Sequence, residues 1–338
     1  MEEYRMESDQ VWLAAVNLHA GSGKTVSLWR EAERLLDRMQ VRYDCRYAGI
    51  QFCIAEIAYG AAAEGFRRFI AVGGDGTIHD VLEGIMKYVE ESSASSAPVR
   101  ISDFTIAVVP IGSGNDWIRI HRIGYDLEET VSLIKAGSFV RQDVVKVSIL
   151  PGPDGQAERG PGMQLPGKWS YMVNIGGVGF DARVCERVNG QKARGKRGKL
   201  LYIKALLYLF FHYRPFPTTV LCDGEKVFEG DCFSVAVGNG KYCGGGLRQT
   251  PDAVFDDGLL DLTVIPASSV RRVLLELPKL FNGRFSSVKG LEICRGRTIS
   301  VLPLAGRCEL VEVDGEIIGS VPVQFEVLPE QINVLHKP

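Results

Sequence analysis

The sequence predicts an α/β protein with two domains: an amino-terminal doubly wound parallel sheet with three Gly-rich turns, and a carboxy-terminal antiparallel β-sandwich. First, apolar strand-like runs alternate with helical patterns over residues 1–140, which is typical of a parallel sheet covered by helices. Second, from about Asp143 strand-like runs dominate, separated by Gly, Pro and Asp-Gly turns, as in a sandwich. Third, 338 residues with 46% hydrophobic content are ample for a packed core and favour two domains over one.

The amino-terminal domain is assigned to residues 1–140, and a last strand within residues 322–338 is expected to return to it. Four apolar runs are its other expected strands: Val11–Val16, Val41–Tyr47, Phe69–Val72 and Phe104–Val109. The helical patterns that follow them are Lys24–Met39, Cys53–Phe66, Ile78–Val89 and a helix that begins near Asn115. The short connections favour a doubly wound arrangement.

The carboxy-terminal domain is assigned to residues 141–321. Its expected strands are Val144–Leu150, Trp169–Val173, Thr218–Cys222, Phe233–Val237, Leu260–Ile265, Thr298–Val301 and Glu309–Val313. Residues 151–162 are so rich in Gly and Pro that they are expected to form an exposed loop. Helical patterns interrupt the strands near Gly198–Tyr213 and Ser269–Leu280.

Composition excludes several classes of protein. The net charge of −2 leaves no overall basic field to hold nucleic acid. The acidic residues 1–9 lack the apolar core of a secretory signal, and the densest apolar run, Ala205–Phe211, is far shorter than the ~20 residues of a spanning helix. Eight cysteines without a CxxC pair indicate reduced thiols, and five histidines without HxxxH spacing argue against zinc. We therefore expect a soluble, cytoplasmic protein.

Three strands of the first domain each run into a Gly-rich turn and then a helix: Asn17–Gly23, Gly73–Thr77 and Gly112–Asp116. In an open parallel sheet such turns all lie at the carboxyl edge, where ligands bind. Glycine lets the backbone approach a ligand closely, and the following helix offers free N–H groups and the positive end of its dipole. One such turn is weak evidence, but three in succession predict a cradle for phosphate groups.

Two common nucleotide-binding motifs do not account for these turns. The run Gly23-Lys24-Thr25 is reminiscent of a Walker P-loop, but that motif needs a glycine where Leu18 stands. No turn has GxGxxG spacing with an acidic residue closing the second strand, which excludes a dinucleotide fingerprint. The remaining interpretation is a kinase whose fold uses neither of these two motifs.

The segment Val72–Ile85, with the sequence VGGDGTIHDVLEGI, resembles the nucleotide-binding motif of diacylglycerol-kinase and sphingosine-kinase-type catalytic domains. The turn at Asn17 resembles the family's first motif, and Pro110–Arg119 resembles its third. Segments of the second domain resemble the family's entry segment, metal-loop region and late acidic motif: Asn174–Asp181, Asn239–Asp261 and Asp314–Glu316. The likeness covers residues 11–330, and the whole set is specific, whereas GGDGT alone also occurs in NAD kinases and phosphofructokinases.

Three positions depart from the family pattern. Leu18 replaces a proline, Ser113 stands where threonine is common, and Trp117 stands where phenylalanine is usual. Ser113 keeps a hydroxyl donor and Trp117 keeps an aromatic ring, so neither endangers the site. Leu18 loosens one turn without removing a backbone donor.

The resemblance implies an ATP-dependent lipid kinase that transfers the γ-phosphate of ATP to a lipid hydroxyl. It implies ATP contacts from the three turns: Asn17, Leu18, His19, Ala20, Gly21, Gly73, Gly74, Asp75, Gly76, Thr77, Ile78, His79, Gly112, Ser113 and Asn115. It also implies Mg²⁺ held by Asp257 with the backbone carbonyls of Val254 and Leu259, an oxygen-rich set that suits a hard cation. Because like charges repel, Asp75 is expected to serve Mg²⁺ or its water rather than to face phosphate alone.

The general base is left open between two groups. In an extended strand Asp314 and Glu316 would point to the same face, and two such carboxylates raise each other's pKa, which suits a base. The resemblance to bacterial members favours Glu316 with Asp314 assisting. In sphingosine-kinase relatives the Asp of the GDG motif, here Asp75, has this role.

A lipid acceptor implies a protein that works peripherally at a membrane surface. The basic segment Lys192–Lys199 precedes the apolar run Leu200–Phe211, and we expect this segment to contact anionic headgroups. Two alternatives stay open: a soluble-substrate kinase of the NAD kinase type, against which the DDGxLD and DGE motifs argue, and a non-catalytic lipid-binding protein on the same fold, against which the intact acidic residues argue. Diacylglycerol, phosphatidylglycerol, a sphingoid base and a polyprenol all remain candidate substrates.

Overall fold

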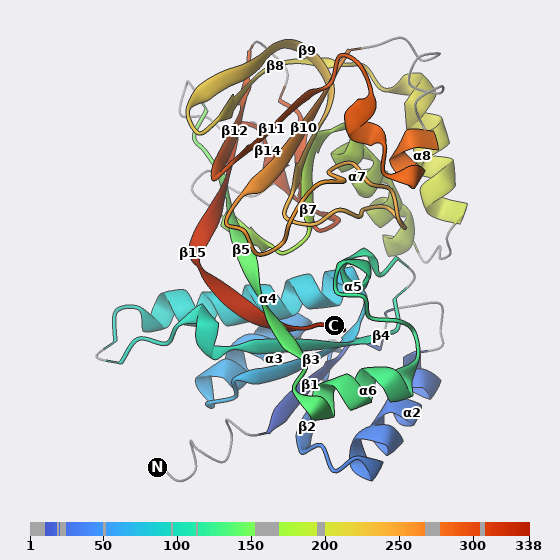
Figure 1. Ribbon diagram of the computed structural model, residues 1–338, viewed down its shortest axis with the longest axis vertical. Helices are drawn as coiled ribbons and strands as arrows, with labels where there is room; N and C mark the ends of the chain where they lie inside the picture. Colours follow the sequence, from blue (N-terminus) through green and yellow to red (C-terminus); the bar gives the residue numbers. More distant parts are fainter. Residues whose placement is uncertain are drawn as a thin grey trace. The chain divides into compact units, whose positions relative to one another are not determined.

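The computed structural model describes residues 11–18, 20, 25–49, 52–95, 97–112, 114–152, 169–194, 200–267, 278–304 and 308–338. Contacts divide the chain into two compact units, the residues up to Gln142 with Glu330–Pro338, and Asp143–Pro329. The predicted fold class is confirmed, because the first unit holds parallel strands with helices and the second holds antiparallel strands (Figure 1). Within the described ranges, no helix combines the length and the apolar character needed to cross a membrane.

The first unit is built on a parallel sheet with the strand order β2-β1-β3-β4-β15. Its strands are β1 (Trp12–Val16), β2 (Tyr43–Tyr47), β3 (Arg68–Gly73), β4 (Thr105–Pro110) and the end of β15 (Val323–Leu335). The chain passes from β2 across β1 to β3, and in open sheets ligands bind at the carboxyl ends beside such a reversal. Val16 lies opposite Val72, and Gly73 lies opposite Pro110. This register brings the ends of three strands, and the turns that follow them, to one edge of the sheet.

Helices cover both faces of this sheet, which explains why all of β1 is buried. The helices are α2 (Thr25–Arg38), α3 (Ile54–Ala63), α4 (Asp75–Ser92), α5 (Asp116–Ile120) and α6 (Leu127–Ala136), with the short 3₁₀ helix η1 (Ile101–Asp103). Figure 1 shows α3 with α4 and α2 with α6, and these two pairs are in contact. A Cβ at Gly84 of α4 would lie 2.2 Å from the carbonyl oxygen of Ala55, so glycine permits the close packing of α3 on α4.

A buried histidine lies near the carboxy-terminal end of the chain. His121 follows α5, and its Nε2 lies 2.9 Å from Oε1 of Gln142, which also accepts a hydrogen bond from Nε1 of Trp117 at 3.0 Å. Nδ1 of His121 lies 3.4 Å from Nδ1 of His336. Burial, followed by the proximity of His336, lowers the pKa of His121 from 6.5 to about 3.

We expect this histidine to make the fold sensitive to acid. Because the pKa of His121 is lower in the folded state, the unfolded state binds more protons below pH 6.5, and stability falls as the pH decreases from there towards 3. This group contributes a slope of about 1.4 kcal/mol per pH unit. The substitution His121→Phe keeps a ring beside Trp117 and should flatten the pH dependence of the free energy of unfolding, measured with urea. The exposed His212→Phe is the control. If the free energy of unfolding has the same slope against pH in the wild type, His121→Phe and His212→Phe, His121 is not the acid-sensitive group.

The second unit consists of antiparallel strands around one apolar core. Its strands are β5 (Phe139–Ile149), β6 (Trp169–Met172), β7 (Ile175–Gly179), β8 (Phe216–Cys222), β9 (Glu225–Gly238), β10 (Leu260–Pro266), β11 (Glu292–Gly296), β12 (Thr298–Pro303), β13 (Leu310–Val313), β14 (Glu316–Ser320) and the start of β15. Their order is β14-β13-β7-β9-β8-β12-β15, with β10 and β11 continuing from β9. Alternate residues of β8 are buried, and Phe216, Val220 and Cys222 belong to the core, as expected for a strand with one covered face.

Two helices of the second unit form a smaller apolar cluster. α7 (Phe180–Ala193) packs against α8 (Leu200–His212), with Val184 of α7 and Phe210 of α8 in the cluster. The predicted helix near Gly198–Tyr213 corresponds to α8, whereas no pattern predicts α7, which is largely polar. The described parts of the unit also include the short 3₁₀ helix η2 (Phe285–Ser287). Apart from residues 151–152 and 278–280, the predicted loop 151–162 and helix Ser269–Leu280 lie outside the described residues.

Candidate active site

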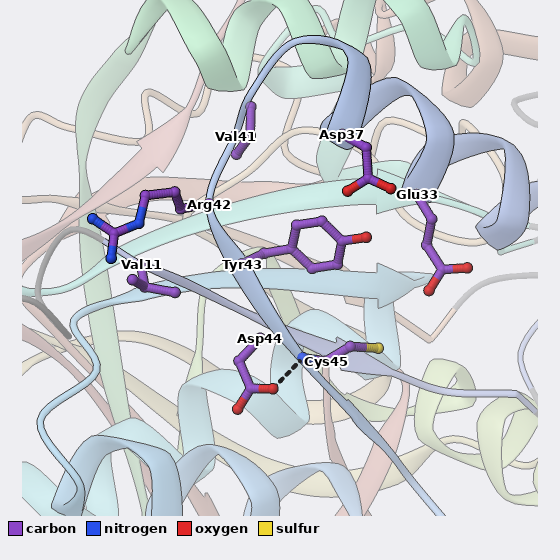
Figure 2. Close-up of a pocket in the computed structure, with 8 residues that line it drawn as sticks. All are labelled: Val11, Glu33, Asp37, Val41, Arg42, Tyr43, Asp44 and Cys45. Atoms are coloured by element: carbon purple, nitrogen blue, oxygen red, sulfur yellow. Dashed lines mark hydrogen bonds between the residues drawn. The ribbon is translucent and has the colours of Figure 1, made fainter.

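A pocket beside the edge strand β2 does not coincide with the Gly-rich turns (Figure 2). Figure 2 shows the carboxylates of Glu33 and Asp37 on the side of the Tyr43 hydroxyl. Burial, followed by Asp37 and Glu33, raises the pKa of Tyr43 to about 12. The full lining is Val11, Glu33, Asp37, Val41, Arg42, Tyr43, Asp44 and Cys45. Its carboxylates outnumber its single arginine, so this pocket is unsuited to the phosphates of a nucleotide.

The first Gly-rich turn is joined to the second by a side chain. Asn17 follows β1, and its backbone N–H donates to the carbonyl of Val72 at 3.1 Å. Its side-chain Nδ2 donates to Oγ1 of Thr77 at 3.3 Å. Ala20 donates its N–H to the carbonyl of Asn17, while Leu18 is exposed. The predicted contacts His19 and Gly21 lie outside the described residues.

The second and third turns touch each other backbone to backbone. A Cβ at Gly112 would lie 2.5 Å from Cα of Gly74 and 2.4 Å from Oδ1 of Asn115. Asn115 is buried, has the left-handed φ of 51°, and donates from Nδ2 to the carbonyl of Gly112 at 2.9 Å. Its buried Oδ1 has no hydrogen-bond partner among the described residues. Glycine is therefore required at 74 and 112 by close approach, and Asn115 fills the space between the two turns.

Asp75 joins the starts of two helices. It is the first residue of α4, and its Oδ2 and Oδ1 accept hydrogen bonds from the backbone N–H groups of Asp116 and Trp117, at 3.1 and 3.0 Å. It thereby caps α5 and fixes the third turn on the second. This role is independent of metal binding, and the expectation that Asp75 serves Mg²⁺ stays a prediction.

The three turns together form a candidate anion site at the amino-terminal end of α4. α4 begins at Asp75, ahead of the predicted Ile78, with Gly74 as its N-cap. Its first turn, which includes Gly76, offers N–H groups and the positive end of the helix dipole to phosphates. The side chains of Ile78 and His79 are buried, so only their backbones are candidates for ligand contact. The predicted Ser113 lies outside the described residues.

We expect Asp75→Asn to abolish most activity while the fold survives. The side-chain oxygen of asparagine can accept a hydrogen bond from one of the two N–H groups of α5. Its NH₂ group would face the other N–H, and two donors cannot bond to each other. The misplaced third turn should lower the kinase rate by more than about tenfold, or ~1.4 kcal/mol of barrier. Asp126→Asn is the control, because Asp126 also caps a helix: its Oδ1 accepts the N–H groups of Glu128 and Glu129 at the start of α6. A nearly normal rate for Asp75→Asn would refute this role.

In the second unit the late acidic motif forms a tight turn. Asp314 and Gly315 have left-handed φ values of 50° and 92°, and Val313 pairs with Glu316 across the hairpin of β13 and β14. The expectation that Asp314 and Glu316 share one face of an extended strand is therefore wrong, because the chain reverses between them. The carboxylate of Asp314 accepts backbone hydrogen bonds from residues 173, 174 and 175, at 3.0 to 3.2 Å. Asp314 thus holds the turn in place.

Glu316 is exposed at the start of β14, and two residues that the sequence analysis did not identify support it. Asn189 of α7 donates from Nδ2 to the carbonyl of Gly315 at 3.0 Å and to Oε2 of Glu316 at 3.4 Å. The buried Glu312 accepts the N–H of Gly315 at 2.8 Å. The turn therefore presents one accessible carboxylate on a support built from β13 and α7.

Glu312 lies beside a second acid, the half-buried Asp181. A Cβ at Gly177 would lie 3.0 Å from Oε1 of Glu312 and 3.4 Å from Cβ of Asp181, so glycine makes room for both. Asp181 accepts from Oγ of Ser234 at 2.5 Å and from Nε2 of Gln249 at 2.9 Å. Burial raises the pKa of both carboxyls, that of Glu312 well above its usual range. Both therefore keep a proton to higher pH than an ordinary carboxyl.

In the predicted metal loop the carboxylate of Asp257 is already engaged by protein donors. Oδ1 of Asp257 accepts the N–H of Leu259 at 3.1 Å, and Oδ2 lies 2.5 Å from Nη2 of Arg295. No group of three or more His, Cys, Asp or Glu suited to a metal ion occurs within the described ranges. A guanidinium on Asp257 does not fit a divalent cation bound at the same oxygens, so the set Asp257, Val254 and Leu259 supports no catalytic step here.

Models of two protein families match the chain. Residues 11–147 match the diacylglycerol kinase catalytic domain, and residues 174–336 match the YegS C-terminal NAD kinase beta sandwich-like domain. The first match contains all three Gly-rich turns, and the second contains Asp181, Asp257 and Glu316.

Individual relatives agree with these matches. The chain is 26% identical over 277 residues to a protein named diacylglycerol kinase from Mycobacterium tuberculosis (strain ATCC 25618 / H37Rv), covering 81% of this chain and 78% of that one. It is 24% identical over 280 residues to a protein named probable lipid kinase YegS-like from Yersinia enterocolitica, covering 81% and 80%. The crystal structure of a diacylglycerol kinase from Bacillus anthracis str. Sterne superposes with a TM-score of 0.70 at 21% identity and covers 98% of both chains, which supports the fold.

Proposed function

We propose that this protein is a lipid kinase that transfers the γ-phosphate of ATP to a lipid hydroxyl at a membrane surface, because it matches the diacylglycerol kinase catalytic domain and the YegS C-terminal domain in succession. The proposed acceptor is diacylglycerol or a related lipid, since a similar protein is named diacylglycerol kinase. The observation that supports catalysis most directly is the set of three turns linked by Asn17, Asp75 and Asn115 at the start of α4.

These turns are proposed to bind the phosphates of ATP. Backbone N–H groups at the amino-terminal end of α4 receive the phosphate oxygens, and Gly74 and Gly112 let the backbone reach them. ATP arrives as its Mg²⁺ complex, in which the metal offsets the charge of the phosphates.

Glu316 is proposed as the general base. It is exposed, while both oxygens of Asp75 and of Asp314 already accept backbone N–H groups. Its carboxylate takes the proton of the lipid hydroxyl as the oxygen attacks the γ-phosphate. Asp314 and Asn189 then act as positioning residues that fix the turn.

The exposed face of α8 is proposed to contact the membrane. Ile203, Leu207 and Phe211 recur with the spacing of one helical face, and their side chains are 50–64% exposed. The exposed Lys204 lies among them, and Lys192 precedes the helix; both favour anionic lipid. Of the predicted basic segment Lys192–Lys199, residues 195–199 lie outside the described residues.

Replacing Ile203, Leu207 and Phe211 together with serine should weaken binding to anionic vesicles. Each buried apolar side chain contributes about 1.5–3 kcal/mol, so we expect a loss of at least ~100-fold in partitioning, measured by vesicle sedimentation. The matched control changes Ile293 and Leu304, which are 43% and 45% exposed in the same unit. ATP affinity should be unchanged in both variants. Equal vesicle binding of the α8 variant and the control would exclude this face.

Lipid and soluble acceptors are compared directly to test the proposed function. The protein is incubated with γ-labelled ATP and either mixed vesicles containing diacylglycerol or NAD in solution. We expect label in the lipid extract and none in NAD. Phosphorylation of NAD would identify a soluble-substrate kinase, and ATP binding without transfer to any acceptor would indicate a non-catalytic lipid-binding protein.

A further inference from the structure

The loop before β10 is held by side chains that meet at Asp257. Oδ2 of this carboxylate lies 2.5 Å from Nη2 of Arg295, and Oδ1 accepts the N–H of Leu259 at 3.1 Å. Both oxygens are thereby engaged by protein donors. The guanidinium of Arg295 stays charged across the pH range in which proteins are studied.

The backbone register fixes Arg295 in this position. β11 runs antiparallel to β10, and Arg295 lies directly opposite Asp261. Nε of Arg295 donates to Oδ2 of Asp261 at 2.9 Å, and the side chain of Asp261 is only 6% exposed. One guanidinium therefore bridges two carboxylates, with its fork geometry and the sheet pairing holding it in place.

The rest of the loop is also tied down by the protein itself. Oδ2 of Asp143 accepts the N–H of Gly258 at 2.7 Å, and the backbone N–H of Asp143 donates to the carbonyl of Phe255 at 2.8 Å. Protein groups on both sides of Asp257 therefore define the shape of the loop. A divalent cation placed on Asp257 would have to displace Arg295, and the positively charged guanidinium would repel it.

We propose that Arg295 supplies the cation of this loop, in the position where the resemblance of the sequence implies Mg²⁺. The loop is then ordered by a permanent monovalent charge belonging to the chain, and its shape is independent of the Mg²⁺ concentration. The proposal can be tested without any catalytic turnover and so stands apart from the proposed function.

The test measures Mg²⁺ binding to the full chain without nucleotide, by calorimetry and by the midpoint of thermal unfolding. Any Mg²⁺-dependent signal of the wild type should be unchanged in Asp257→Asn, because no Mg²⁺ is bound at Asp257. In Arg295→Met the two carboxylates lose their cation, so a Mg²⁺-binding signal that the wild type lacks should appear, with a matching rise in the unfolding midpoint. Arg297→Met is the control, since Arg297 lies beside Gly258 and should leave Mg²⁺ binding as in the wild type.

Two results would overturn the proposal. One is Mg²⁺ binding to the wild type that disappears in Asp257→Asn, which would place the metal on the loop in spite of Arg295. The other is an Arg295→Met variant that folds with the stability of the wild type and acquires no Mg²⁺ affinity. If Arg295→Met does not fold, the comparison of the wild type with Asp257→Asn still decides the question.

Discussion

Glu316→Gln is expected to lower the maximal rate by about 10²–10⁴-fold while the affinity for ATP stays near normal, because a general base acts in the transition state. Glutamine preserves the size of the side chain and its contact with Asn189, so the turn should keep its shape. Steady-state kinetics and nucleotide binding by calorimetry separate the two quantities. Glu326→Gln, at another exposed position of the second unit, is the matched control and should behave as wild type.

The neighbouring variants distinguish a base from a support. Asp314→Asn replaces a carboxylate that accepts backbone N–H groups on both oxygens, so it should lower stability as well as rate. Asn189→Ala should lower the rate less than Glu316→Gln does, because the carboxylate of Glu316 remains. If Glu316→Gln turns over nearly as fast as the wild type, the base lies elsewhere and Asp75 becomes the candidate.

Gly112→Ala is expected to abolish ATP binding. The added Cβ would lie 2.5 Å from Cα of Gly74 and 2.4 Å from Oδ1 of Asn115, so the second and third turns must separate. Gly74→Val should act in the same way, because its branched side chain meets Cα of Gly112 and fills the space meant for phosphate. Calorimetric titration with ATP measures the loss directly.

Gly60→Ala is the control for both glycine variants. Gly60 lies inside α3 with nothing within 4 Å of a Cβ, so alanine there should be tolerated or slightly stabilising. Far-ultraviolet circular dichroism establishes whether each variant folds. A folded Gly112→Ala protein that binds ATP normally would exclude these turns from the nucleotide site.

The three Gly-rich turns of the first unit were predictable from the sequence because their signals are local. Each turn follows a run of apolar residues and precedes a helical pattern, and the topology of a parallel sheet brings strand ends to one edge. The contacts of Asn17, Asp75 and Asn115 agree with that expectation, although their roles towards ATP stay predictions. Asp75 and Asn115 also fix the third turn on the second. The sequence pattern did not predict this structural role.

The acidic turn of the second unit depends on contacts between residues far apart in the chain, which periodicity does not encode. Glu312 and Asn189 meet at one turn although a helix, several strands and a loop separate them in sequence. Asp314 was misplaced because Asp314-Gly315 was treated as part of an extended strand, although an Asp-Gly pair with two positive φ values is typical of a hairpin turn. α7 was missed because its polar residues carry only a weak helical pattern.

The transfer of label from γ-labelled ATP to lipid in mixed vesicles tests the central claim most directly, when wild type, Glu316→Gln and Gly112→Ala are assayed side by side. The account predicts one labelled lipid product with the wild type, a rate lower by about 10²–10⁴-fold with Glu316→Gln, and no product with Gly112→Ala. Label that never enters the lipid extract, whichever lipid is supplied, would contradict it, and so would equal transfer by all three proteins.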